Sequence, residues 1–163
     1  MVAQRFRTAS EKEVERDWRE FTGGGPVVGI LRQYEASDVQ GLIWDDESSG
    51  HRGLVSWWVD GERAEIVSVH AEPTGGAIGT RLMDAAEDEL RRCGVMKVVL
   101  ATTNDNVRAL NFYLKRGYRL VRVHLDAMDA VRRVKPAVPE IGRDGIPLRD
   151  MWEVEKDLLR RVA

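Results

Sequence analysis

Residues 63–123 alternate between strand-like and helix-like patterns, and this alternation restricts the possible folds more than any other feature of the sequence. Apolar, β-rich runs at residues 63–70, 97–102 and 118–123 predict three strands. A helix is predicted after the first strand because apolar residues recur there every three or four positions, at Ile78, Leu82, Ala86, Leu90 and Cys93. The charged residues between them, which include Glu87, are predicted to face away from the core. A second helix is predicted at 106–116. Two strand–helix–strand units in succession predict parallel pairing with right-handed crossovers.

The first sixty residues predict a helix followed by an antiparallel meander. Ser10 and Glu13 form a capping box that opens a charged helix, and the glycines at 23–25 end it. The turn signal Asp60-Gly61 leads into the strand at residue 63. Three further strands are predicted upstream of this turn, at residues 27–34, 42–44 and 54–59.

The last forty residues predict a helix at 127–134 and a long loop rich in proline and glycine at 136–147. Residues 149–158 predict a final edge strand, with a helix as the alternative. We therefore expect a single α/β domain over residues 1–163, with a mixed sheet flanked by helices. Its parts are an N-terminal helix with a glycine-rich turn (1–26), the core (27–123), an insertion (124–150) and a C-terminal strand or tail (151–163). Long loops in compact domains are often functional, so the insertion is a candidate for a functional role.

The composition is that of an ordinary globular domain, with 43% hydrophobic and 32% charged residues among 163. A formal net charge of -2 gives no support for binding to nucleic acid or to a membrane surface. No apolar run approaches the roughly 18 residues of a membrane span, and no secretory signal is expected. The single cysteine, Cys93, is expected to be a small core residue in a reducing, cytoplasmic compartment.

A glycine-rich segment joins the strand that ends at His70 to the helix that begins near Ile78. Glycines directly before a helix let the backbone approach an anion, and the helix N-terminus directs unpaired N–H groups toward it. A diphosphate would fit such a site, although the same residues also suit a flexible turn before an ordinary helix. Two nucleotide-binding motifs are excluded, because the sequence has no Gly-Lys-Ser/Thr of a P-loop and no G-x-G-x-x-G at this segment.

A second polar segment follows the strand at 97–102. It reads Asn-x-x-Ala-x-x-Phe-Tyr-x-x-x-Gly-Tyr from Asn106 to Tyr118. This pattern resembles the second half of the cofactor site in the GCN5-related N-acetyltransferases.

The glycine-rich segment resembles the first half of that site, the pyrophosphate loop Arg/Gln-x-x-Gly-x-Gly/Ala. In register on Gly79, Thr74 takes the Arg/Gln position and Ala77 the position of the first glycine. The loop therefore departs from the family pattern twice, since Thr74 is not basic and Ala77 carries a methyl group. The resemblance extends well over residues 54–123.

The resemblance implies a sheet that splays between the parallel strands 65–70 and 97–102, with acetyl-CoA as co-substrate in the opening. The pantetheine arm would pair with backbone groups of the first strand, and the diphosphate would lie on the glycine-rich loop. Asn106 would hydrogen-bond the pantetheine amide, and Asn104 competes with it for this role. The cofactor contacts implied in this way are Ser68, Val69, His70, Thr74, Gly75, Gly76, Ala77, Ile78, Gly79, Thr80, Asn104, Asn106, Ala109 and Tyr113.

The resemblance also points to two candidate catalytic residues. Glu65 lies on the strand before the loop, where several family members place a general base, and burial would raise its pKa toward working pH. The alternative is a solvent-facing glutamate. Tyr113 would protonate the departing thiolate, unless it is a core residue of its helix. His70 either relays a proton or is structural.

The implied reaction is direct transfer of the acetyl group to a primary amine of a small molecule or peptide, which needs no covalent enzyme intermediate and no metal. No cluster of His, Cys, Asp or Glu has metal-ligand spacing. The alternatives are a non-catalytic acyl-CoA-binding module and a nucleotide-binding enzyme, and a homodimer is compatible with the sequence. The insertion selects no charge of the acceptor, because it carries both signs, at Asp126, Asp129, Arg132, Arg133 and Lys135.

Overall fold

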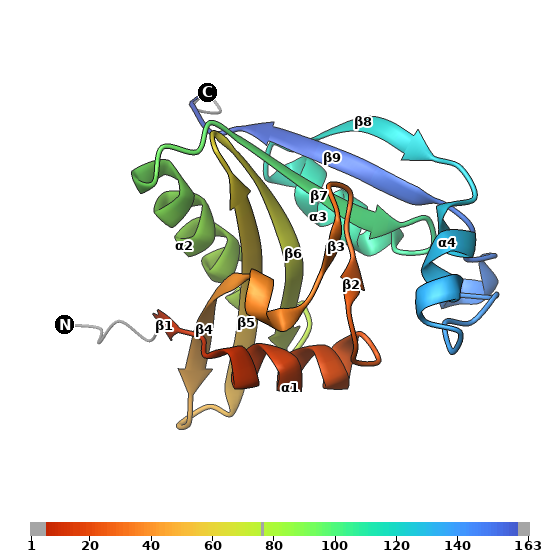
Figure 1. The fold of residues 1–163 in the computed structure, drawn as a ribbon. Coiled ribbons are helices and arrows are strands. Elements are labelled where there is room, and N and C mark those ends of the chain that lie inside the picture. Colours follow the sequence, from red (N-terminus) through yellow and green to blue (C-terminus); the bar gives the residue numbers. More distant parts are fainter. Residues whose placement is uncertain (1–5, 76, 160–163) are drawn as a thin grey trace.

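A seven-stranded mixed sheet, in the order β1–β4–β5–β6–β7–β9–β8, forms the centre of the structure (Figure 1). The computed structural model describes residues 6–75 and 77–159. The strands of the sheet are β1 (Phe6–Thr8), β4 (Gln40–Asp46), β5 (His51–Asp60), β6 (Arg63–Glu72), β7 (Lys97–Thr103), β8 (Arg119–His124) and β9 (Met151–Asp157). A separate hairpin consists of β2 (Val27–Val28) and β3 (Gln33–Tyr34). The helices are α1 (Glu11–Phe21), α2 (Ile78–Arg92), α3 (Val107–Lys115) and α4 (Ala127–Val134), with short 3-10 turns at Ala36–Asp38 and Arg143–Gly145.

These elements confirm the predicted α/β fold with a mixed sheet flanked by helices. Within the described ranges, no helix is long and apolar enough to span a membrane. Among the described strands, β6 and β7 are the one parallel pair, and α2 connects them as predicted.

The second predicted crossover, from β7 through α3 to β8, does not give a neighbouring pair. β9 lies between β7 and β8 and is antiparallel to both. The prediction of β9 as an edge strand is therefore wrong, and β8 is the edge strand. The reason is the long register between β7 and β9, in which every residue of β9 has a partner in β7.

The segment predicted as one strand at 27–34 is a hairpin that stands outside the main sheet. Its turn folds onto Glu65 of β6, whose carboxylate accepts hydrogen bonds from the N–H groups of Ile30 and Leu31 at 2.5 and 2.9 Å. A side chain at Gly29 would collide with this carboxylate, so only glycine fits at the turn. The local sequence pattern does not predict this turn, because the carboxylate that holds it comes from a distant strand.

Helices cover both faces of the sheet (Figure 1). α2 and α3 pack on one face, in a core that includes Leu82 and Leu100. α1 and the β2–β3 hairpin pack on the other face, around Trp18 and Tyr34. A third cluster joins α4 to the segment that follows it, through Met128, Val131, Leu148 and Met151. The insertion at 124–150 is therefore packed structure with its own small core.

A buried carboxylate, Glu87, lies on the side of α2 that the sequence assigned to solvent; 2% of its surface is exposed. It accepts hydrogen bonds from Lys156 of β9 at 2.7 Å, from the Tyr118 hydroxyl at 3.0 Å and from Arg116 at 3.2 Å. The prediction that Glu87 faces away from the core is wrong, because its partners come from segments that helical periodicity does not include. Cys93, predicted in the core, is exposed because α2 ends just before it.

Replacing Glu87 with alanine should lower the free energy of unfolding by about 3–5 kcal/mol, because the buried ammonium of Lys156 would lose its partner. The control is Glu89→Ala, since Glu89 pairs with Arg92 at the surface of the same helix and should contribute less than about 1 kcal/mol. Urea unfolding of both variants measures the difference. Equal losses would show that the Glu87 cluster does not fasten α2 to the sheet.

Candidate active site

β6 and β7 pair only over their first residues and then separate. The last paired residues are Glu65 and Val99, although β6 continues to Glu72 and β7 to Thr103. Figure 1 shows the two strands diverging from their paired ends. The edge of β6 beyond this point is not used by β7, so an extended ligand can hydrogen-bond to it as an additional strand. This separation confirms the predicted splay of the sheet.

A β-bulge in β6 sets the directions of the side chains beside the opening. Val67 is the extra residue, since its neighbours Ile66 and Ser68 pair with adjacent residues of β5. Ser68 points to the α1 side, where its hydroxyl accepts a hydrogen bond from the Trp18 indole at 2.9 Å. Val69 packs against the core on the α2 side. Packing thus occupies both side chains, and the backbone is what these residues can offer to a ligand.

His70 lies farther along β6 on the α1 side. Its Nδ1 is 2.5 Å from a carboxylate oxygen of Asp17, and its ring stacks on Phe21 with 4.6 Å between the centroids. A carboxylate at one ring nitrogen favours the tautomer whose other nitrogen can accept a proton. The sequence did not single out Asp17, because α1 carries many charged residues and nothing in their spacing marks this one.

The glycine-rich loop connects the end of β6 to α2. Gly75 has a φ of +82°, a left-handed conformation that suits glycine. The N-cap residue of α2 is Ala77, whose side chain cannot cap, and the first turn carries no acidic residue. The N–H groups of this turn are therefore available to an anion. A side chain at Gly79 would meet only the edge of Phe112, at 3.8 Å, and Gly76 lies outside the described residues.

Thr74 brings no charge to this loop, but Arg108 does. Arg108 belongs to the first turn of α3, and its Nη2 would be 2.6 Å from a Cβ placed on Gly75, so the guanidinium covers the loop. Thr80 is exposed in the first turn of α2, and Ile78 is buried and anchors that turn. Sequence reasoning missed Arg108; the absence of a basic residue at the loop was the signal that another cation should be sought.

The two candidate asparagines have different surroundings. Asn106 is the N-cap of α3, and its side-chain oxygen accepts a hydrogen bond from the Ala109 N–H at 3.2 Å. Its amide N–H groups can still donate. Asn104 instead fastens the insertion, because its oxygen accepts from the N–H groups of Arg149 and Asp150 and its nitrogen donates to the Pro147 carbonyl.

Tyr113 is half-buried in α3. Its ring meets those of Phe112 and Tyr118 edge to face, with centroids 5.2 and 5.6 Å apart. Burial raises the pKa of the Tyr113 hydroxyl to about 12, so the group is protonated at neutral pH and can donate a proton.

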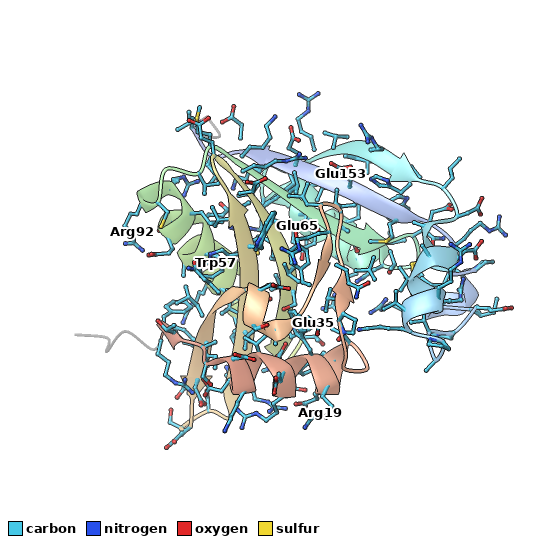
Figure 2. All side chains as sticks on the ribbon, viewed as in Figure 1. Arg19, Glu35, Trp57, Glu65, Arg92 and Glu153 are labelled. Carbon is cyan, nitrogen blue, oxygen red and sulfur yellow. The ribbon has the colours of Figure 1, made fainter. Side chains whose placement is uncertain are left out.

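Glu65 occupies the point where β6 and β7 separate, in the middle of the molecule (Figure 2). It is 1% exposed, so the alternative of a solvent-facing glutamate is wrong. Its carboxylate accepts a hydrogen bond from the Tyr34 hydroxyl at 2.5 Å in addition to those from the hairpin turn. Burial raises the pKa of Glu65, and these hydrogen bonds oppose part of the rise. The same carboxyl, with its raised pKa, also holds the hairpin through these hydrogen bonds.

The opening is therefore bordered by the unpaired edge of β6, by the uncapped first turn of α2 and by the buried carboxyl of Glu65. Over residues 6–75 and 77–159, no group of three or more His, Cys, Asp or Glu side chains is arranged to hold a metal ion. The arrangement suits a long, extended ligand with an anionic end, and its side chains can accept and donate protons.

Comparisons with known proteins agree with this geometry. The family model described as Acetyltransferase (GNAT) family matches residues 6–118. The uncharacterised protein YdhI of Bacillus subtilis (strain 168) is 35% identical over 122 residues, which cover 75% of this chain and 74% of that protein.

Two solved structures have the same fold. The IAA acetyltransferase from Bacillus cereus ATCC 14579 has a TM-score of 0.72 at 18% identity, over 93% of this chain and 97% of that one. A GNAT family acetyltransferase from Elizabethkingia anophelis with acetyl-CoA bound has a TM-score of 0.63 at 20% identity, over 74% of this chain and 77% of that one. The family match spans more than half of the sequence, and so this chain belongs to the GNAT acetyltransferase family.

Proposed function

We propose that the protein transfers the acetyl group of acetyl-CoA to a primary amine. The observation that carries this proposal is the opening between β6 and β7, with the anion-binding loop of α2 on one side and the N-terminus of α3 on the other. Holding thioester and amine together supplies much of the rate, and one proton then has to leave the amine while another reaches the thiolate. Direct attack needs no covalent enzyme intermediate.

Acetyl-CoA lies in the opening in this proposal. The pantetheine arm pairs with the backbone edge of β6 at 68–70, and Asn106 donates an amide N–H to a pantetheine carbonyl, since its oxygen already accepts from Ala109. The diphosphate lies on the loop at 74–80. Arg108, whose guanidinium covers this loop, adds the positive charge that the loop itself lacks.

Glu65 is the proposed general base. Burial shifts the pKa of Glu65 upward, in the direction of neutral pH. Glu65 also lies where β6 and β7 separate, which in this proposal is near the acyl end of a pantetheine arm bound to β6. Because the hairpin encloses its oxygens, the amine proton passes to it through a water molecule. The Asp17–His70 pair is the second candidate base, favoured by its 2.5 Å contact.

Tyr113 is the proposed general acid. A phenol with a pKa of about 12 remains protonated until a thiolate forms beside it. Asn106 and Tyr113 are separated by about two helical turns and so lie near one face of α3, which brings the hydroxyl to the same side as the pantetheine.

A non-catalytic acyl-CoA-binding module is the alternative function. It is favoured by the departures at Thr74 and Ala77 and by the enclosure of Glu65. Thiol release from acetyl-CoA with a mixed panel of amines, measured beside a CoA titration, separates the two functions. Binding without any amine-dependent turnover supports the module, and better thermal protection by ATP or NAD than by CoA supports a nucleotide-binding enzyme.

The first prediction from this proposal concerns the diphosphate. Acetyl-CoA at 100 times its Kd should stabilise the protein by about 2.7 kcal/mol. Arg108→Gln should weaken acetyl-CoA binding about tenfold, because a charge-assisted contact to phosphate is lost. It should affect turnover of S-acetylpantetheine far less, since that acetyl donor has no phosphate. The control is Arg122→Gln on the exposed strand β8. Equal losses with both donors in the Arg108 variant would contradict a phosphate contact.

A pH profile tests Glu65 as the base. The Tyr34 hydroxyl lowers the pKa of Glu65 through its hydrogen bond, so Tyr34→Phe should raise that pKa further. A base must be deprotonated to act, so the acidic limb of the kcat profile should move to higher pH and the plateau should survive. Glu65→Gln should remove this limb and lower kcat by roughly 10²–10⁴. If the kcat profile of Tyr34→Phe does not move, the acidic limb belongs to a group other than Glu65. If His70→Gln loses the acidic limb, the base is the Asp17–His70 pair.

Tyr113→Phe should lower kcat by roughly 10², with CoA affinity and melting temperature nearly unchanged, because only the proton donor is removed. Tyr118→Phe is the matched control, since the Tyr118 hydroxyl donates to Glu87 and serves the fold. That variant should melt earlier and keep its kcat. Single-turnover thiol release and thermal unfolding measure the two effects. A wild-type rate in Tyr113→Phe would make Tyr113 a packing residue.

A further inference from the structure

A groove of about 600 Å³ lies between the β2–β3 hairpin and the insertion. It is lined by the end of α1, by β2, by α4 and by the loop after α4. Thr103 and Asp105, at the carboxyl end of β7, line it as well. These two residues lie beyond the last residue of β7 that pairs with β6, and Asp105 directly precedes Asn106. The groove therefore reaches the carboxyl end of β7, the strand that borders the opening in which we place acetyl-CoA.

The walls of the groove are mostly apolar. Val28 of the hairpin faces Met128, Val131, Leu148 and Met151 of the third cluster. The loop that closes the insertion side is held by a guanidinium, because Arg132 donates to the carbonyls of Pro139 and Leu148. The groove is thus a built surface that can bury the hydrocarbon part of a small molecule.

Three charged side chains of the described residues line the groove, and two of them neutralise each other. Arg143 pairs with Asp105, with its Nη1 3.1 Å from a carboxylate oxygen that also accepts the Arg143 N–H at 2.9 Å. The third charge is Lys135. Its ammonium donates to the carbonyl of Thr22 at 3.0 Å and to the hydroxyl of Thr22 at 3.3 Å, and no carboxylate of the described residues forms an ion pair with it.

The surroundings of Lys135 only partly compensate its charge. Thr22 is the C-cap of α1, so its carbonyl carries part of the negative end of the helix dipole, equivalent to about half a unit charge. An ammonium has three N–H donors, and these two contacts can occupy two of them. Burial lowers the pKa of Lys135, which means that its charged form lacks solvation that an anion would supply.

We propose that this groove binds the acetyl acceptor and selects a primary amine with an apolar body and an anionic group, which pairs with Lys135. The apolar walls hold the body, Lys135 holds the anion, and the amine is directed toward the end of β7. This inference rests on the proposed acetyl transfer and adds the substrate class to it. The anionic group on the acceptor is a carboxylate or another group of the same charge.

The test compares amines that differ only in that charge. The pairs are 6-aminohexanoate with 6-aminohexanamide, 4-(aminomethyl)benzoate with 4-(aminomethyl)benzamide, and leucine with leucinamide, which cover different distances between amine and anion. In at least one pair, kcat/KM for the carboxylate should be at least ten times that for the amide. Lys135→Met should bring this ratio close to one, and Lys135→Glu should shift the preference to diamines. Arg133→Met, an exposed cation of α4 outside the groove lining, should keep the wild-type ratio.

Two results would overturn the proposal. One is wild-type turnover of the neutral amines with no preference for a carboxylate in any pair. The other is an unchanged ratio in Lys135→Met. A purely structural role of Lys135 at the end of α1 predicts a lower melting temperature together with that unchanged ratio, so thermal unfolding of each variant is measured as well.

A binding measurement separates this inference from the proposed function. Hexanoate and 4-methylbenzoate carry the body and the anion but no amine, and NMR titration of the wild type and of Lys135→Met follows their binding directly. Binding that depends on Lys135, in a protein without any amine-dependent turnover, would support the anion site and contradict the proposed acetyl transfer. Turnover of amines, without binding that depends on Lys135 and without a preference for carboxylates, would support the acetyl transfer and contradict the anion site.

Discussion

The end of pairing between β6 and β7 after Glu65 and Val99 is the constraint on which the rest of the structure depends. Two strands that separate inside a sheet leave backbone groups without partners, and each such group costs about 1–3 kcal/mol if it stays buried and unsatisfied. Something must therefore hold the strands apart, and something must use the exposed edge. The packing around the opening holds the strands apart, and the acetyl-CoA proposed here pairs with the exposed edge.

Two buried glutamates fasten the elements on either side of this opening. Glu65 holds the turn of the β2–β3 hairpin on the α1 face, through N–H groups and the Tyr34 hydroxyl. Glu87 joins α2 to the end of α3 and to β9 on the other face, through Arg116 and Lys156. Because a buried carboxylate is costly without partners, each glutamate specifies its neighbours strongly. The hairpin, α2 and the C-terminal end of α3 are thereby fastened beside the opening.

The insertion forms one wall of the groove that we propose for the acceptor. Asn104 ties it to the end of β7 through the backbone at 147–150, and its own small core packs against Val28 of the hairpin. Its charges, which looked evenly mixed along the sequence, are sorted by this packing. Arg143 is neutralised by Asp105, while Lys135 faces the groove. Selection of an anionic acceptor would follow from that sorting rather than from the net charge of the segment.

Local sequence determined the features that depend on neighbouring residues. The capping box at Ser10, the periodicity of α2, the turn at Gly61 and the N-cap at Asn106 follow from short-range hydrogen bonds and from one-sided burial, which spacing records. Tertiary structure alone decided the features that join distant segments. The place of β9 between β7 and β8, the burial of Glu87, the contact of Arg108 with the loop and the exposure of Lys135 to the groove all depend on partners from other elements. A pattern along one segment carries no record of such partners, because burial and charge pairing are set by what packs against a side chain and not by its position in the chain.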